Sequence, residues 1–93
     1  MTVQVLLPGA LASLAGGAKH LDLDAGGGTL ADVLDALAAR HPMLARRIRD
    51  ETGQVRRFVN VYVDGDDVRF EGGLAAAVRD GAEVQVLPSV AGG

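Results

Sequence analysis

The chain ends in two consecutive glycines, Gly92 and Gly93, which follow a short stretch of small residues. Glycine lacks a Cβ and adopts backbone angles that other residues avoid, so such an end can enter a passage too narrow for a side chain. The group that it would deliver is the main-chain carboxylate of Gly93. A free carboxylate is inert at neutral pH, but a partner that converts it to an acyl adenylate opens it to attack by a sulfur or amine nucleophile. With sulfur, the product is a thiocarboxylate.

The side chains of the sequence do not form a self-contained active site. There is no cysteine, and His20 and His41 have no second histidine at ligand spacing, so no metal site is expected. Ser13 and Ser89 lie outside the sequence context of a nucleophile elbow. We therefore expect a protein that is not an enzyme and that binds neither a cofactor nor a metal ion.

Two glycine- or aspartate-rich segments have simpler structural explanations. Residues 26–28 are glycines before Thr29 and could cradle a phosphate, but the lysine of a P-loop is missing, which favours a turn and a helix cap. The acidic residues Asp64, Asp66 and Asp67 lack the glutamate that completes a calcium loop, which favours a hairpin turn.

Composition excludes several classes of protein. The chain has 93 residues, enough for one domain, and its net charge of −3 argues against general nucleic-acid binding. No apolar run reaches the ~20 residues of a membrane helix, and the start has no signal-peptide profile. We expect a cytoplasmic protein without nucleic-acid or membrane partners. Arginines crowd between residues 40 and 57, which indicates either a solvated loop or a polarised surface that orients the protein on a partner.

Apolar residues alternate with polar ones in four segments, which predicts strands at residues 2–7, 20–24, 58–63 and 83–88. Val68 and Phe70 predict a short returning strand after the hairpin signal at residues 64–65. Residues 9–17 are interpreted as a connection without regular structure.

One helix is predicted between Thr29, a good N-cap with Asp32 three residues later, and the stop at His41-Pro42. Its apolar stripe consists of Leu30, Val33, Leu34, Leu37 and Ala38. Shorter helical turns are predicted within residues 43–48 and 74–78. Two hairpins flanking a helix, with the first and last strands parallel in the middle, predict an α+β fold. It is the ubiquitin-like β-grasp, a mixed sheet of four to five strands with one main helix across it, in residues 1–88. Residues 89–93 are expected to form a flexible C-terminal reactive tail that ends in Gly-Gly.

The same alternation predicts a docking face. If Val84 and Val86 are buried, Leu87 points to the other side of the sheet, together with Phe58 and Tyr62. Exposed apolar groups near a reactive tail are typical of an interaction site. Val90 and Ala91 in the tail would complete the contact with a partner.

The sequence resembles bacterial sulfur-carrier proteins of the ThiS/MoaD group, and within it the CysO-type carriers of cysteine biosynthesis in actinobacteria. The resemblance covers nearly the whole chain, including the arginine-rich loop at residues 45–57. It is most specific in residues 57–63 (RFVNVYV), 67–70 (DVRF), 72–74 (GGL) and 90–93 (VAGG). The VAGG ending alone would fit the small subunit of molybdopterin synthase equally well. The resemblance to the carriers of cysteine biosynthesis therefore depends on the long strand motif, residues 57–63.

The resemblance implies a set of partners. An E1-like enzyme would use ATP to adenylate Gly93, and a sulfur donor would convert it to a thiocarboxylate. A PLP-dependent cysteine synthase that uses O-phosphoserine would accept the sulfur, and a JAMM-type zinc peptidase would release cysteine. Gly92 and Gly93 correspond to the reactive end of the family and Leu87 to its apolar docking position. Alternatives are the small subunit of molybdopterin synthase, a ubiquitin-like modifier of protein lysines, and a structural module whose tail has no role.

Overall fold

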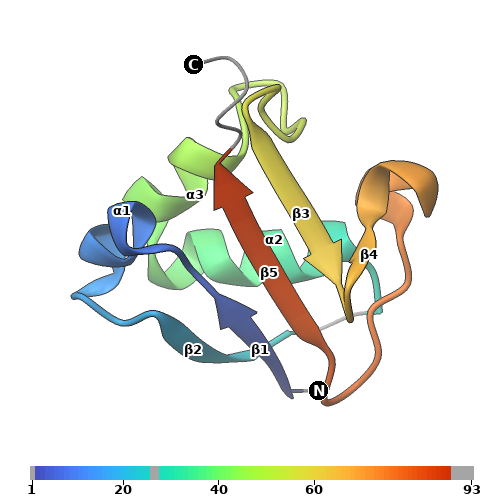
Figure 1. The fold of residues 1–93 in the computed structure, drawn as a ribbon, viewed down its shortest axis with the longest axis horizontal. Coiled ribbons are helices and arrows are strands. Elements are labelled where there is room, and N and C mark those ends of the chain that lie inside the picture. The colour runs from blue at the N-terminus through green and yellow to red at the C-terminus, as the bar shows by residue number, and fades with distance from the viewer. Residues whose placement is uncertain (1, 26–27, 89–93) are drawn as a thin grey trace.

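The computed structural model describes residues 2–25 and 28–88, which form one sheet with helices on one face (Figure 1). The sheet has five strands in the order β2-β1-β5-β3-β4. The strands are β1 (Thr2–Leu6), β2 (His20–Asp24), β3 (Val59–Val63), β4 (Asp66–Asp67) and β5 (Glu83–Pro88). The α-helices are α1 (Gly9–Ala12), α2 (Leu30–Arg40) and α3 (Pro42–Ile48). Three short 3₁₀ turns cover Ser13–Ala15, Val68–Phe70 and Gly73–Ala75.

The first and last strands lie side by side in the centre of the sheet. β1 and β5 are parallel, with Val5 opposite Val84, whereas β2 and β3 flank them in antiparallel pairing. The helix α2 crosses behind the strands in Figure 1. This arrangement confirms the predicted β-grasp fold.

The core lies between the sheet and α2. Most strand side chains that face the helix are fully buried, among them Val3, Val5, Val61, Val84 and Val86, whereas Leu21, Val59 and Val63 are half-buried. Four of the five residues of the predicted helix stripe are fully buried as well: Leu30, Val33, Leu34 and Leu37, whereas Ala38 is only partly buried. Burial of each such valine or leucine contributes roughly 1.5–3 kcal/mol, so the alternation in the strands and the helical stripe fix the sheet against α2.

A capping box starts α2 where the sequence predicts it. The hydroxyl of Thr29 accepts a hydrogen bond from the Asp32 N–H at 3.3 Å, and the Asp32 carboxylate accepts one from the Thr29 N–H at 3.2 Å. These bonds satisfy two backbone donors that have no partner within the helix. Gly28 also accepts a hydrogen bond from the Val78 N–H, which ties the start of the helix to the last third of the chain.

The turn between β3 and β4 uses Asp64 and Gly65, whose φ angles are 49° and 89°. Positive φ at both central residues is the mark of a type I′ hairpin turn. The Asp64 side chain accepts a hydrogen bond from the Glu83 N–H at 2.9 Å, so this carboxylate holds the start of β5. The prediction of a hairpin turn at this position is confirmed.

Two local predictions are wrong. Residues 9–15 are helical rather than an unstructured connection, because Pro8 begins α1 as its N-cap and Gly16, with φ of 68°, ends the following 3₁₀ turn. Val68 and Phe70 lie in a 3₁₀ turn rather than a strand, because the Asp67 side chain accepts a hydrogen bond from the Arg69 N–H and curls the chain.

Candidate functional site

The strand β5 carries the chain to the predicted reactive tail. It is paired with β1 as far as Gln85 and with β3 as far as Pro88, so it is held on both sides over its first half and on one side to its end. A central strand anchored in this way gives the tail a fixed starting point. The predicted site residues Val90, Ala91, Gly92 and Gly93 lie outside the described residues, and their roles remain predictions.

Two of the predicted docking residues share the face of the sheet opposite to α2. Asn60 is opposite Leu87 and Tyr62 is opposite Gln85 across the β3–β5 pair, so Tyr62 and Leu87 are diagonal neighbours. Both are half-buried. Val86, which directly precedes Leu87 in β5, points into the core instead and is fully buried. The strands β1, β5 and β3 present this face to the viewer in Figure 1. We refer to it below as the open sheet face.

Leu6 extends this face, although the docking prediction did not include it. It lies opposite Gln85 in the parallel β1–β5 pair and is half-buried. The signal was present in the sequence, because Val3 and Val5 occupy the buried positions of β1 and leave Leu6 on the opposite side.

Phe58 lies immediately before β3, and 64% of it is exposed. It lines a groove of about 540 Å³ beside the end of β5, in which the apolar residues Leu11 and Pro88 also take part. Three arginines, Arg46, Arg47 and Arg56, complete this lining together with Val59. We call it the tail-base groove because Pro88 is the last residue of β5. Phe58 therefore lies beside the apolar residues of the groove, and in the chain it directly precedes Val59, the first residue of β3.

The arginine-rich segment separates into structural and unpaired side chains. Arg49 forms a salt bridge with Asp35 at 2.8 Å and donates a hydrogen bond to the Gly53 carbonyl at 2.6 Å, so it ties α2, α3 and the following loop together. The Nε–H of Arg56 donates to the Arg46 carbonyl at 2.7 Å, which satisfies a carbonyl in the last turn of α3. Within residues 2–25 and 28–88, the guanidinium groups of Arg46 and Arg47 have neither a hydrogen-bond partner nor an ion pair.

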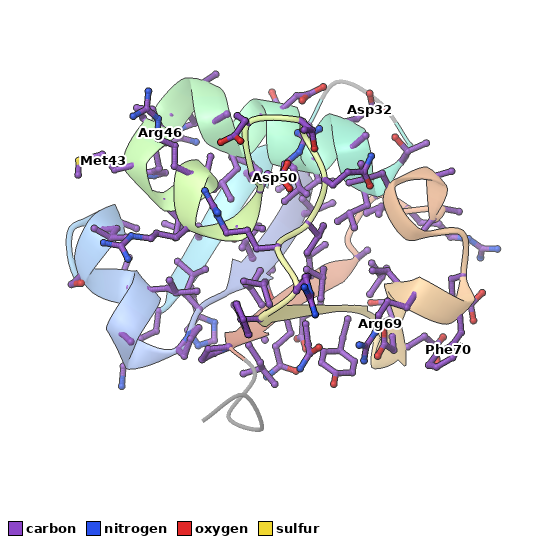
Figure 2. The ribbon with its side chains drawn as sticks, turned by 90° about the horizontal axis from the view of Figure 1, so that it is seen from above. Asp32, Met43, Arg46, Asp50, Arg69 and Phe70 are labelled. Atoms are coloured by element: carbon purple, nitrogen blue, oxygen red, sulfur yellow. The ribbon has the colours of Figure 1, made fainter. Side chains whose placement is uncertain are left out.

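Asp50, the carboxylate nearest in sequence to Arg46 and Arg47, is held by hydrogen bonds within the turn that follows it. Asp50 accepts hydrogen bonds from the Thr52 N–H at 2.8 Å, from the Thr52 hydroxyl and from the Gln54 N–H. The Thr52 hydroxyl holds the pKa of Asp50 below its ordinary range, and the charge of Arg56 lowers it further. Figure 2 shows Asp50 on the loop after α3, and Met43 and Arg46 projecting outward from the helix itself.

The described part of the chain contains neither a candidate metal site nor a candidate membrane-spanning helix. Among these residues no group of three or more histidine, aspartate or glutamate side chains could hold a metal ion. None of the helices within the described ranges is long and apolar enough to cross a membrane.

Comparisons with known proteins place the chain in one family. The ThiS family model matches residues 5–93. The sulfur carrier protein CysO of Mycobacterium tuberculosis is 44% identical over 95 residues, which cover 100% of both chains. In a crystal structure of the Amycolatopsis orientalis BexX/CysO complex, the matching chain is 42% identical, with a TM-score of 0.85 over 98% of this chain and 99% of that one.

A further solved relative is a modifier protein. The crystal structure of small archaeal modifier protein 1 from Haloferax volcanii is 31% identical, with a TM-score of 0.83 over 100% of both chains. The curated relatives confirm the expectation of a carrier protein rather than an enzyme. The β-grasp fold, the match to residues 5–93 and the full-length similarity to CysO together show that the chain belongs to the ThiS family of sulfur-carrier proteins.

Proposed function

We propose that the protein carries sulfur as a thiocarboxylate on Gly93 and delivers it to cysteine biosynthesis. The observation that carries the proposal is the full-length similarity to CysO, which extends over the whole of both chains and so includes the Gly-Gly ending. In the described structure, the side chains around β5 do not form a catalytic arrangement, whereas the strand itself is firmly paired up to Pro88. A protein in which the strand holds the tail and the main-chain carboxylate is the reactive group would have these features.

The chemistry requires a partner that activates an inert carboxylate. A Gly93 oxygen attacks the α-phosphate of ATP on an E1-like enzyme, and pyrophosphate leaves. A sulfur nucleophile then attacks the acyl adenylate at the Gly93 carbonyl carbon and AMP leaves, which yields the thiocarboxylate. By the family resemblance, a PLP-dependent cysteine synthase accepts the sulfur and a JAMM-type zinc peptidase releases the product and restores Gly93.

The fold contributes a fixed exit and a docking surface. The open sheet face presents Leu6, Tyr62 and Leu87 beside the end of β5, and such partly exposed apolar clusters are typical of interaction sites. The five residues after Pro88 can span roughly 16 Å when extended. A partner that binds this face and has its active site within that distance of Pro88 would therefore receive Gly93 without any change in the domain. The complex of a similar CysO with BexX supports docking of a partner protein by this fold.

The proposal is tested by incubating the protein with its cognate E1-like enzyme, ATP and a sulfide source. Intact-mass spectrometry is expected to show one oxygen-to-sulfur exchange, and fragmentation is expected to place it at Gly93. The variant Gly92→Val should keep the melting temperature of the wild type and fail to be activated, because a side chain now occupies the narrow passage. Absence of the mass change with every candidate activator, or normal activation of Gly92→Val, contradicts the proposal.

A second candidate function is conjugation to protein lysines. The similarity to small archaeal modifier protein 1 over the whole of both chains favours it. The same acyl adenylate would then be attacked by a lysine amine instead of sulfur. Isopeptide-linked adducts in cell extracts, detected as Gly-Gly remnants on lysines after digestion, would identify this use. The chain itself has one lysine, Lys19, so extended self-linked chains would have to pass through that residue.

A further inference from the structure

The tail-base groove combines charge and apolar surface from segments that are far apart in sequence. Arg46 and Arg47 come from α3, Leu11 comes from α1, and Pro88 ends β5. Its volume of about 540 Å³ is in the range of clefts that bind ligands, roughly 300–1,000 Å³. The groove is therefore a surface assembled by the fold, and not a consequence of one basic loop.

The side chains that line the groove carry positive charge, and the nearest carboxylate, Asp50, lies outside the lining and interacts with the charge of Arg56. Of the described residues that line it, three are arginines and none is acidic, although the whole chain has a net charge of −3. The hydrogen bond from the Arg56 Nε–H to the Arg46 carbonyl fixes the orientation of the Arg56 guanidinium. Its terminal nitrogens have no partner among residues 2–25 and 28–88, and the same holds for the guanidinium of Arg47. Such forked donors match carboxylates in geometry as well as in charge.

The apolar half of the groove narrows the choice of occupant. Leu11, Phe58, Val59 and Pro88 line it, and 64% of Phe58 remains exposed. A small free anion would use the arginines and leave this apolar surface in water. An acidic peptide segment that also carries leucine or another apolar side chain would use both halves.

We propose that the tail-base groove docks an acidic segment, interspersed with apolar side chains, of the enzyme that acts on the tail. The inference rests on the proposed function, because the groove borders the residue from which the tail starts. The arginines that share the groove with Pro88 attract the acidic segment, which brings the partner to the correct end of the molecule. The acidic remainder of the surface repels the same segment and thus prevents docking elsewhere.

The binding step is tested with a defined probe. A fluorescent peptide of sequence Glu-Asp-Leu-Glu-Asp-Leu is titrated with the full-length protein, and its neutral analogue Gln-Asn-Leu-Gln-Asn-Leu serves as control. The double variant Arg46→Gln/Arg47→Gln should weaken binding of the acidic peptide roughly five- to tenfold, as expected for two partly solvated charge pairs. The matched control is Arg40→Gln/Arg79→Gln, which removes two exposed arginines outside the groove and changes the net charge equally.

Several outcomes would overturn the proposal. Equal weakening by the two double variants would mean non-specific attraction, and equal binding of the neutral peptide would remove the role of charge. Displacement of the peptide by inorganic phosphate at similar concentration would make the groove a simple anion site. Much tighter peptide binding after deletion of residues 89–93 would assign the groove to the protein's own tail.

A kinetic measurement connects the groove to the activating enzyme. Arg46→Gln/Arg47→Gln should raise the KM of the carrier in activation by a similar factor and leave kcat unchanged, because the groove contributes binding and not chemistry. A lower kcat with unchanged KM would overturn this role. Since peptide binding is measured without activation, failure of the chain to accept sulfur would count against the proposed function alone.

Discussion

Val86 and Leu87 are consecutive residues of β5 that face opposite sides of the sheet. Val86 is fully buried against α2, and Leu87 is half-buried on the open sheet face. Truncation of each to alanine therefore separates what the strand contributes to stability from what it contributes to docking.

The expected losses of stability differ because the burial differs. Val86→Ala removes two fully buried methyl groups at about 0.8 kcal/mol each and leaves a cavity, so the free energy of unfolding should fall by about 2–3 kcal/mol. Leu87→Ala removes atoms that are only partly shielded from water, so the loss should be about 1 kcal/mol. In a domain of this size, each 1 kcal/mol lowers the melting temperature by about 4–8 °C.

The effect on docking should be the reverse. If the partner covers Leu87 at the centre of an interface, its truncation should cost about 1–2 kcal/mol of binding, which corresponds to a roughly five- to thirtyfold rise in the KM of the carrier. Val86→Ala should have the wild-type KM, because the removed methyl groups never reach the surface. Melting is followed by circular dichroism, and activation by the rate of AMP release below the lowest melting transition.

One result would contradict this assignment of Leu87 to the docking surface. If Leu87→Ala melts as early as Val86→Ala and is activated with an unchanged KM, then Leu87 belongs to the core and the open sheet face is not where the partner binds.

Two further predictions concern the fold. Thr29→Ala removes the hydroxyl of the capping box and should reduce the free energy of unfolding by about 1 kcal/mol without changing the slope of urea denaturation; an unchanged urea midpoint would contradict it. The hydrogen bonds from Arg69 lower the pKa of Asp67, so this carboxylate stabilises the fold above its ordinary pKa of about 4 and loses its effect as the pH falls further. Melting of Asp67→Asn should thus depend less on pH than wild-type melting between pH about 5 and 2, and identical profiles would count against it.

Much of the fold follows from short-range patterns in the sequence. The period-2 alternation predicts that Val84 and Val86 are the buried side chains of β5, and both are fully buried. The predicted last strand, residues 83–88, agrees with β5 at both ends. Thr29 and His41-Pro42 likewise mark the two ends of α2, since cap residues act within one turn of the helix.

The two wrong predictions come from interactions that compete with simple periodicity. Val68 and Phe70 alternate as strand residues do, yet the side chain of Asp67 bonds the next turn of backbone and makes it curl. The run between Pro8 and Gly16 is short and rich in alanine, which favours a connection when periodicity alone is considered. Pro at the start and Gly at the end are in fact helix boundary signals, and their positions match α1 and its 3₁₀ extension.

The candidate site was less predictable, because it depends on where distant segments meet. Alternation was sufficient to place Tyr62 and Leu87 on one face, since each belongs to a regular strand. The groove, by contrast, requires α1 and α3 to approach the end of β5, and the sequence shows only that arginines are frequent between residues 40 and 57. Which of these arginines are available for a partner is decided by hydrogen bonds and ion pairs, as for Arg49.

The positions of the two candidate surfaces constrain how a partner could bind. The open sheet face and the tail-base groove share the end of β5, because Leu87 belongs to the first and Pro88 to the second. A single enzyme whose active site receives the tail would therefore meet apolar side chains on one side of this strand and arginines on the other. Apolar contact gives such a complex most of its affinity, whereas charge sets its orientation and rate of association. Variants at Leu87 should accordingly act at all salt concentrations, whereas those at Arg46 and Arg47 should lose their effect as salt increases.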